Sequence, residues 1–221
     1  MELLDIGGGN ASVDTLINNG GEEILHDGTA SATTVMSGGL LLVSVGLAST
    51  GAIADGLTLS GGTAILSGSA GAGQIVTFVG AGGDLVLDNL SAFSAQIAGF
   101  DLPSQKIDLG GFTYSSTGET RSWTEAAGGA SGTLTVSDGR QVAALTLLGN
   151  YVTSNFTLSN DGSGGTFIVD PAISGGTARF AQATATFGRG SGLPAGRIES
   201  VSASSSLFGA LPLSPTSAAH G

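Results

Sequence analysis

The chain has 221 residues, of which 39 are glycine and only 10% are charged, a composition that suits a chain turning after every short strand. Its 17 acidic and 6 basic residues give a net charge of −11, which argues against binding to nucleic-acid phosphates or to anionic lipid headgroups. The absence of cysteine excludes disulfides and thiolate metal sites.

The beginning of the sequence carries no export or membrane signal. Residues 1–8 lack the basic and apolar segments of a secretory signal peptide, so export is expected to use a C-terminal signal, unless the sequence is a truncated piece. The densest apolar run, residues 40–45, is far shorter than the roughly 20 apolar residues of a membrane-spanning helix. No transmembrane helix is expected.

A repeat fills the first part of the chain. Two glycines, two variable residues and two aliphatic residues recur in segments that begin at Gly20, Gly38, Gly61 and Gly82. A second β-prone run follows each of the first three segments, at residues 33–36, 57–59 and 74–79. The pattern predicts two strands and two turns per repeat, stacked about 4.8 Å apart as a parallel β-helix.

The repeat also predicts which side chains face the interior. Glycine pairs suit the corners because glycine adopts positive φ without cost and leaves room for the next coil. Alternation along each strand favours the last aliphatic residue as the inward one, with its neighbour two positions earlier. The last residues are Leu25, Val43, Leu66 and Leu87, and the earlier neighbours are Leu41, Ala64 and Leu85 in three copies. Glu23 is the anomaly in this register.

The second half predicts antiparallel hairpins. Residues 132–137 and 141–147 flank a turn at Asp138-Gly139, and residues 156–158 and 167–169 flank a glycine-rich loop. The fold class is therefore all-β, a parallel β-helix (β-solenoid) of three to four coils followed by an antiparallel β cap and a disordered tail. The expected segments are a solenoid over 1–89, a hairpin and cap module over 90–171, and an Ala/Ser/Gly-rich tail over 172–221.

These glycine-punctuated units resemble the passenger repeats of AIDA-type autotransporter adhesins. Residues 107–166 are similar to a module that follows such repeats in large exported glycine-rich proteins of alphaproteobacteria. The resemblance implies secretion or display on the bacterial cell surface or outer membrane, with a role in adhesion or matrix. No C-terminal translocator barrel is recognisable in the sequence.

The sequence disfavours catalysis. Residues 1–105 contain no lysine or arginine, whereas the polysaccharide-cleaving β-helix enzymes need carboxylates and basic groups together. A Ser-His-Asp arrangement could use only His26, because the other histidine, His220, lies in the tail. The chain is predicted not to be an enzyme.

Two aspartates are the only candidate metal ligands. Asp84 lies within a partial match to the nonapeptide of calcium-binding β-rolls, at residues 80–86, and Asp161 lies in an acidic glycine loop. Calcium β-rolls need tandem copies nine residues apart, and no second copy follows Asp84. An ordinary corner with an exposed aspartate is therefore the simpler interpretation, and no other cofactor is expected.

Two functions remain from the sequence. The first is a non-enzymatic secreted or cell-surface module for structure or adhesion, with a host-cell, glycan or matrix surface as partner and with the chain as part of a larger fibre. The alternative is a type I secreted, calcium-stabilised β-roll protein accessory to an extracellular enzyme. Neither function involves nucleic acid.

Overall fold

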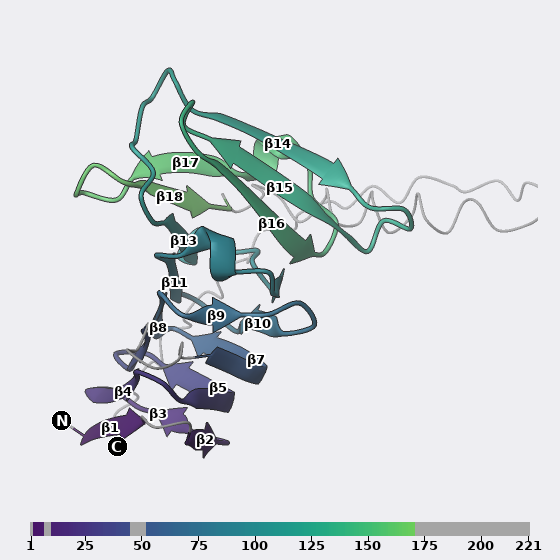
Figure 1. Cartoon of the computed structure of the whole chain (residues 1–221). Helices are drawn as coiled ribbons and strands as arrows, with labels where there is room; N and C mark the ends of the chain where they lie inside the picture. Colours follow the sequence, from purple (N-terminus) through teal and green to yellow (C-terminus); the bar gives the residue numbers. More distant parts are fainter. Residues whose placement is uncertain (1, 7–9, 45–51, 171–221) are drawn as a thin grey trace, which may run out of the picture. The chain divides into compact units, whose positions relative to one another are not determined.

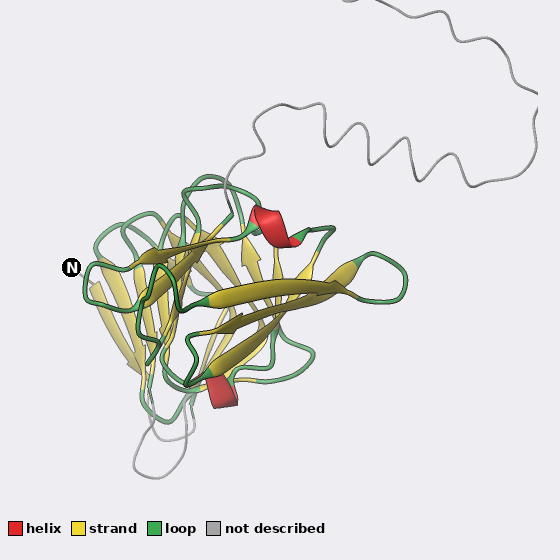
Figure 2. Cartoon of the chain, turned by 90° about the horizontal axis from the view of Figure 1, so that it is seen from above, coloured by secondary structure: helices red, strands yellow, loops and turns green. Residues whose placement is uncertain are grey.

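The computed structural model describes residues 2–6, 10–44 and 52–170, all within one compact unit, Met1–Gly175. Two short 3-10 helices, Leu90–Ala92 and Thr153–Asn155, are the only helical elements in these ranges, and the rest are strands and loops (Figure 2). No helix in this part of the chain is long and apolar enough to span a membrane. The predicted all-β class is confirmed. The predicted tail, residues 172–221, lies outside the described residues.

Sheet A contains eight strands in the order β1-β4-β6-β8-β11-β13-β18-β17. Pairing is parallel from β1 to β13 and antiparallel between β13, β18 and β17. The strands are β1 (Glu2–Ile6), β4 (Gly21–Leu25), β6 (Leu40–Val43), β8 (Thr63–Leu66), β11 (Asp84–Leu87), β13 (Lys106–Leu109), β18 (Thr166–Val169) and β17 (Thr157–Asn160).

Sheet B contains ten strands in the order β14-β15-β16-β12-β10-β7-β5-β2, with β3 beside β5 and β9 beside β7. Pairing is parallel from β2 to β16 and antiparallel in the hairpins of β14, β15 and β16. The strands are β14 (Thr120–Glu125), β15 (Ser131–Ser137), β16 (Val142–Leu148), β12 (Gln96–Ala98), β10 (Ile75–Phe78), β7 (Ala52–Ser60), β5 (Thr29–Met36), β2 (Ala11–Val13), β3 (Leu16–Ile17) and β9 (Ser69–Ala70).

The chain alternates between the two sheets and builds a parallel β-solenoid of about five turns, whose strands stack from β1 to β13 (Figure 1). The expected count of three to four turns is too low, because parallel pairing continues past Asn89 through β12 and β13. No glycine pair precedes β13. Instead, the Gln105 side chain accepts hydrogen bonds from the backbone of Asp101 and Leu102 and donates one to the carbonyl of Gly80.

Each early turn has a bend that the sequence did not predict. The backbone is left-handed at Asp14, Ala32 and Asp55, with φ between 50° and 53°. The register between β5 and β7 shifts at the same place. In the first turn the bend separates β2 from β3, whereas β5 and β7 each continue through the bend as one strand.

The predicted interior register is confirmed. Leu41, Ala64 and Leu85 share one register row with Ile107, and all four are fully buried. The second predicted row is buried as well: Leu25, Val43, Leu66 and Leu87. Stacking like residues in register produces two continuous apolar columns behind sheet A.

The glycine pairs act by two different mechanisms. The first glycine of a pair has positive φ, as at Gly38 (76°) and Gly61 (88°), where other L-residues are strained. At two of the pairs the second glycine is sterically required: a Cβ at Gly39 would lie 2.5 Å from the Ile17 carbonyl oxygen, and one at Gly62 would lie 2.5 Å from that of Met36. The corners are thus closed by backbone of the preceding turn.

Antiparallel strands follow the solenoid. β15 and β16 form the hairpin expected around Asp138-Gly139. Behind them, Trp123, Tyr151 and Phe156 pack with ring centroids 5.2 to 5.8 Å apart. The Tyr151 hydroxyl donates a hydrogen bond of 2.9 Å to the carbonyl of Phe100. Strand pairs β12–β16 and β13–β18 make the two sheets continuous from the solenoid into the hairpins.

Candidate functional site

Sheet A carries a row of branched aliphatic side chains on its outer face. These residues alternate with buried ones and are each partly exposed, and they pair in register from β4 to β11: Ile24, Leu42, Ile65 and Val86. We call them the aliphatic stripe. The sequence already showed two adjacent aliphatic residues in every repeat, and the structure places the outer one of each pair here.

Aspartates lie at both ends of the aliphatic stripe. Asp5 of β1 is opposite Ile24, and Asp108 of β13 is opposite Val86. A second outward row runs alongside the stripe: Glu22, Leu40, Thr63, Asp84 and Lys106. The face is therefore apolar in its middle turns and charged at its two ends.

Both candidate calcium ligands lie at the charged end near β13. Burial raises the pKa of Asp108 to about 6, and the negative charges of Asp161, Asp88 and Asp84, in that order, add to the effect. The structure thus brings Asp84 and Asp161 into the electrostatic field of one carboxyl, Asp108, which the sequence did not single out.

The described residues around Asp84 and Asp161 do not form a cluster of metal ligands. Among the residues that the structure describes, no three His, Cys, Asp or Glu side chains are grouped so as to hold a metal. Asp161 Oδ1 accepts hydrogen bonds from the backbone N–H groups of Ser163 (2.6 Å) and Gly165 (2.8 Å) within its own loop. Asp84 lies opposite Lys106 in the register. Calcium binding by Asp84 and Asp161 therefore stays a prediction from sequence.

The raised pKa of Asp108 predicts a pH dependence of stability. The folded state binds this proton more tightly than the unfolded chain, so stability increases as pH falls from about 6 towards 4. We expect Asp108→Asn to stabilise the protein by about 1 kcal/mol at pH 8, after allowance for solvent screening. Thermal melts at pH 5 and pH 8 measure this gain. Asp138→Asn is the control, because backbone hydrogen bonds, first that of Gln141, lower the pKa of Asp138. An unchanged pH dependence in Asp108→Asn would refute the assignment.

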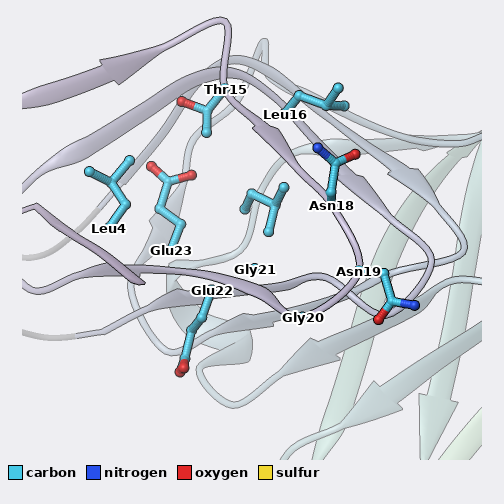
Figure 3. A pocket seen from close by; sticks show the side chains of 10 residues that line it. Leu4, Thr15, Leu16, Asn18, Asn19, Gly20, Gly21, Glu22 and Glu23 are labelled. Atoms are coloured by element: carbon cyan, nitrogen blue, oxygen red, sulfur yellow. The ribbon is translucent and has the colours of Figure 1, made fainter. Parts of the chain in front are cut away.

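A pocket of about 390 Å³ lies at the N-terminal turns, lined by Leu4 and residues 15–23 (Figure 3). Glu23 is 1% exposed and lies in the same register row as Leu41. It therefore faces the interior, as the register predicted from the sequence requires. Ser12 donates a hydrogen bond to Oε1, whereas Oε2 has no partner. Burial raises the pKa of this carboxyl, opposed by the Ser12 hydrogen bond.

His26 is the histidine that the sequence left open for catalysis. Its Nδ1 lies 3.1 Å from Ser44 Oγ, and its Nε2 lies 3.8 Å from Asp5 Oδ1. The aspartate is beyond hydrogen-bond distance, and the Ser44 hydroxyl donates to the carbonyl of Leu25. His26 and Asp5 are 52% and 61% exposed, so solvent screens their interaction. The three residues lack the buried and aligned geometry of a hydrolytic triad.

Comparison of the chain with protein-family models, curated proteins and solved structures finds no match. The aliphatic stripe is a continuous apolar surface that crosses four consecutive strands of sheet A.

Proposed function

We propose that the chain is a non-enzymatic structural and adhesive module, secreted or displayed on the bacterial cell surface, like the passenger of an AIDA-type autotransporter adhesin. The observation that supports this proposal is the aliphatic stripe on the parallel strands of sheet A. Four apolar side chains held about 4.8 Å apart offer a contact surface that needs little ordering on binding.

The character of sheet A favours one class of partner. A stripe of aliphatic side chains gains free energy by removing apolar surface from water, at roughly 25 cal/mol per Å². Aspartates at both ends of the stripe favour basic residues beside that apolar contact. We therefore propose a protein of the host-cell surface or extracellular matrix as partner, in preference to a glycan.

The test replaces the middle of the stripe. Leu42→Lys combined with Ile65→Lys keeps both positions on the solvent side of sheet A, so the fold is expected to persist. We expect the variant to bind cultured cells or matrix-coated surfaces at least tenfold more weakly than the unchanged chain. Thr34→Lys combined with Thr58→Lys is the matched control, because these residues pair in register on the outer face of sheet B.

Two outcomes would refute the adhesive role. One is binding of the unchanged chain at the level of an unrelated acidic protein. The other is equal loss of binding in the sheet A variant and the sheet B control, which would indicate a general charge effect. Circular dichroism of all three proteins verifies that differences in binding do not come from unfolding.

The alternative to the adhesive module is the calcium-stabilised β-roll that Asp84 and Asp161 suggest from the sequence. Because no group of three suitable ligands occurs within the described ranges, we expect the melting temperature to be the same in calcium and in excess chelator. A melting temperature several degrees lower in chelator would favour the β-roll. The calcium ligands would then include residues outside the described ranges.

A further inference from the structure

Among the described residues, no strand lies on the outer edge of β1. Within residues 2–6, 10–44 and 52–170, β1 pairs only with β4 and is the terminal strand of sheet A. An unpaired edge presents backbone N–H and C=O groups that can accept a further parallel strand. Leu4, opposite the buried Glu23 in the register, is 39% exposed at this edge. The pocket of about 390 Å³ opens beside Leu4 (Figure 3).

The strand β8 and its corner define what such an added strand requires. Leu59, Ala64 and Leu66 point to the interior and are buried, whereas Ile65 faces outward and belongs to the aliphatic stripe. Gly61 forms the corner with φ +88°. A matching sequence therefore needs apolar residues at three positions and a glycine at the corner.

Residues 173–180 meet these requirements. Their sequence, Ile-Ser-Gly-Gly-Thr-Ala-Arg-Phe, has the same central five residues as residues 59–66, Leu-Ser-Gly-Gly-Thr-Ala-Ile-Leu. The interior positions of β8 correspond to Ile173, Ala178 and Phe180, which are all apolar. The outward position, aliphatic throughout the stripe, corresponds to Arg179.

We propose that residues 175–180 of one molecule pair with β1 of a second molecule as a parallel strand. In the register that β1 makes with β4, Ala178 then lies opposite Leu4, and Arg179 lies opposite Asp5. Asp5 is 61% exposed and accessible to a guanidinium group. The outward row then continues with a salt bridge between the two molecules.

Charge distribution supports this pairing. Residues 172–221 contain three of the six basic residues and only one acidic residue, Glu199. Residues 1–171 therefore carry the other 16 of 17 acidic residues and three basic ones. A basic segment and an acidic body attract each other, most strongly at low ionic strength.

The length of the connection requires a second molecule. From β18 to β1, sheet A crosses six strand intervals, and a strand beyond β1 adds a seventh, which gives about 34 Å. The six Cα–Cα steps from Asp170 to Gly176 span at most about 22 Å when fully extended. The segment cannot reach the β1 edge of its own chain.

The proposed contact joins two different surfaces and repeats from molecule to molecule. Such heterologous contacts build rings when the rotation closes and open fibres when it does not. Self-association of this kind goes beyond the adhesive role and does not depend on it, because it uses the β1 edge rather than the aliphatic stripe.

Sedimentation velocity of the full chain tests the proposal. We expect species larger than dimers that grow with protein concentration and shrink with added salt. Arg179→Asp and Asp5→Arg should each weaken association at least tenfold, and the two together should restore it. Arg189→Asp, which removes another arginine of the same segment, is the control and should leave association unchanged. A chain that stays monomeric at millimolar concentration, or that assembles equally well with Arg179→Asp, would overturn the proposal.

Disulfide trapping tests the register, because the chain has no cysteine of its own. Leu4→Cys with Ala178→Cys places two thiols opposite each other on neighbouring strands, at a spacing compatible with a disulfide. Intermolecular cross-links are expected with this pair and not with Leu4→Cys and Thr177→Cys, which differs by one residue. Equal cross-linking of both pairs would overturn the register.

Cell-binding assays of the sheet A variant remain a separate readout, so failure of the self-association proposal is distinguishable from failure of the adhesion proposal.

Discussion

Gly62→Ala is expected to destabilise the protein by about 3 kcal/mol, or roughly 9 °C in melting temperature. The added Cβ would lie 2.5 Å from the Met36 carbonyl oxygen and 2.5 Å from Val35 Cγ1. Both atoms belong to the preceding turn, so the substitution pushes two turns apart. Because a backbone oxygen cannot move aside as a side chain does, relief requires displacement of strand β5.

Gly71→Ala is the matched control for the corner. A Cβ at Gly71 would meet no heavy atom within 4 Å, and its φ is not positive. We expect its effect to stay within about 0.5 kcal/mol. Chemical denaturation of both variants gives the comparison. Equal stabilities would mean that contact between turns does not explain the second glycine of each pair.

Phe156→Ala is expected to cost about 4 kcal/mol, or roughly 12 °C in melting temperature. The ring is fully buried, with its centroid 5.3 Å from Tyr151 and 5.8 Å from Trp123. Its removal leaves a cavity among the aromatic residues behind the hairpins. Trp123 is the only tryptophan of the chain, so its fluorescence reports this region selectively.

The same variant tests whether the hairpins unfold together with the solenoid. Because both sheets continue from the solenoid into the hairpins, we expect fluorescence and circular dichroism to show one coincident transition. Val152→Ala is the control, since Val152 is 49% exposed in the same region and should change stability by less than about 0.5 kcal/mol. The contrary result is a fluorescence transition at a lower temperature, with the circular dichroism transition unchanged. It would show that the hairpins unfold independently and do not stabilise the solenoid.

The buried residues of sheet A could be predicted from the sequence, because each repeat marks both the position of the corner and the residues that face inward. The first glycine marks a left-handed corner, and the aliphatic residues after it mark the inward positions. Glu23 broke the pattern in the sequence and is buried in the structure, where its Oε2 has no hydrogen-bond partner.

The last turn and the bends could not be predicted in the same way. At the last turn no glycine pair marks the corner, and the side chain of Gln105 forms hydrogen bonds with backbone groups of Asp101, Leu102 and Gly80. At the bends, Asp14, Ala32 and Asp55 adopt positive φ without being glycine, so no residue type marks the position. The aliphatic stripe was visible as a second apolar residue in each repeat, but alternation alone does not assign a function to the outward one.

A distance between sheet A strands far apart in sequence tests the five-turn stack most directly. Glu22 and Lys106 occupy one outward register row that runs through β4, β6, β8, β11 and β13. Four strand intervals separate them, which corresponds to about 19 Å. With both residues replaced by spin-labelled cysteine in this cysteine-free chain, double electron–electron resonance should give a narrow distribution near 20 Å. A broad distribution, or a mean beyond about 30 Å, would contradict the parallel solenoid.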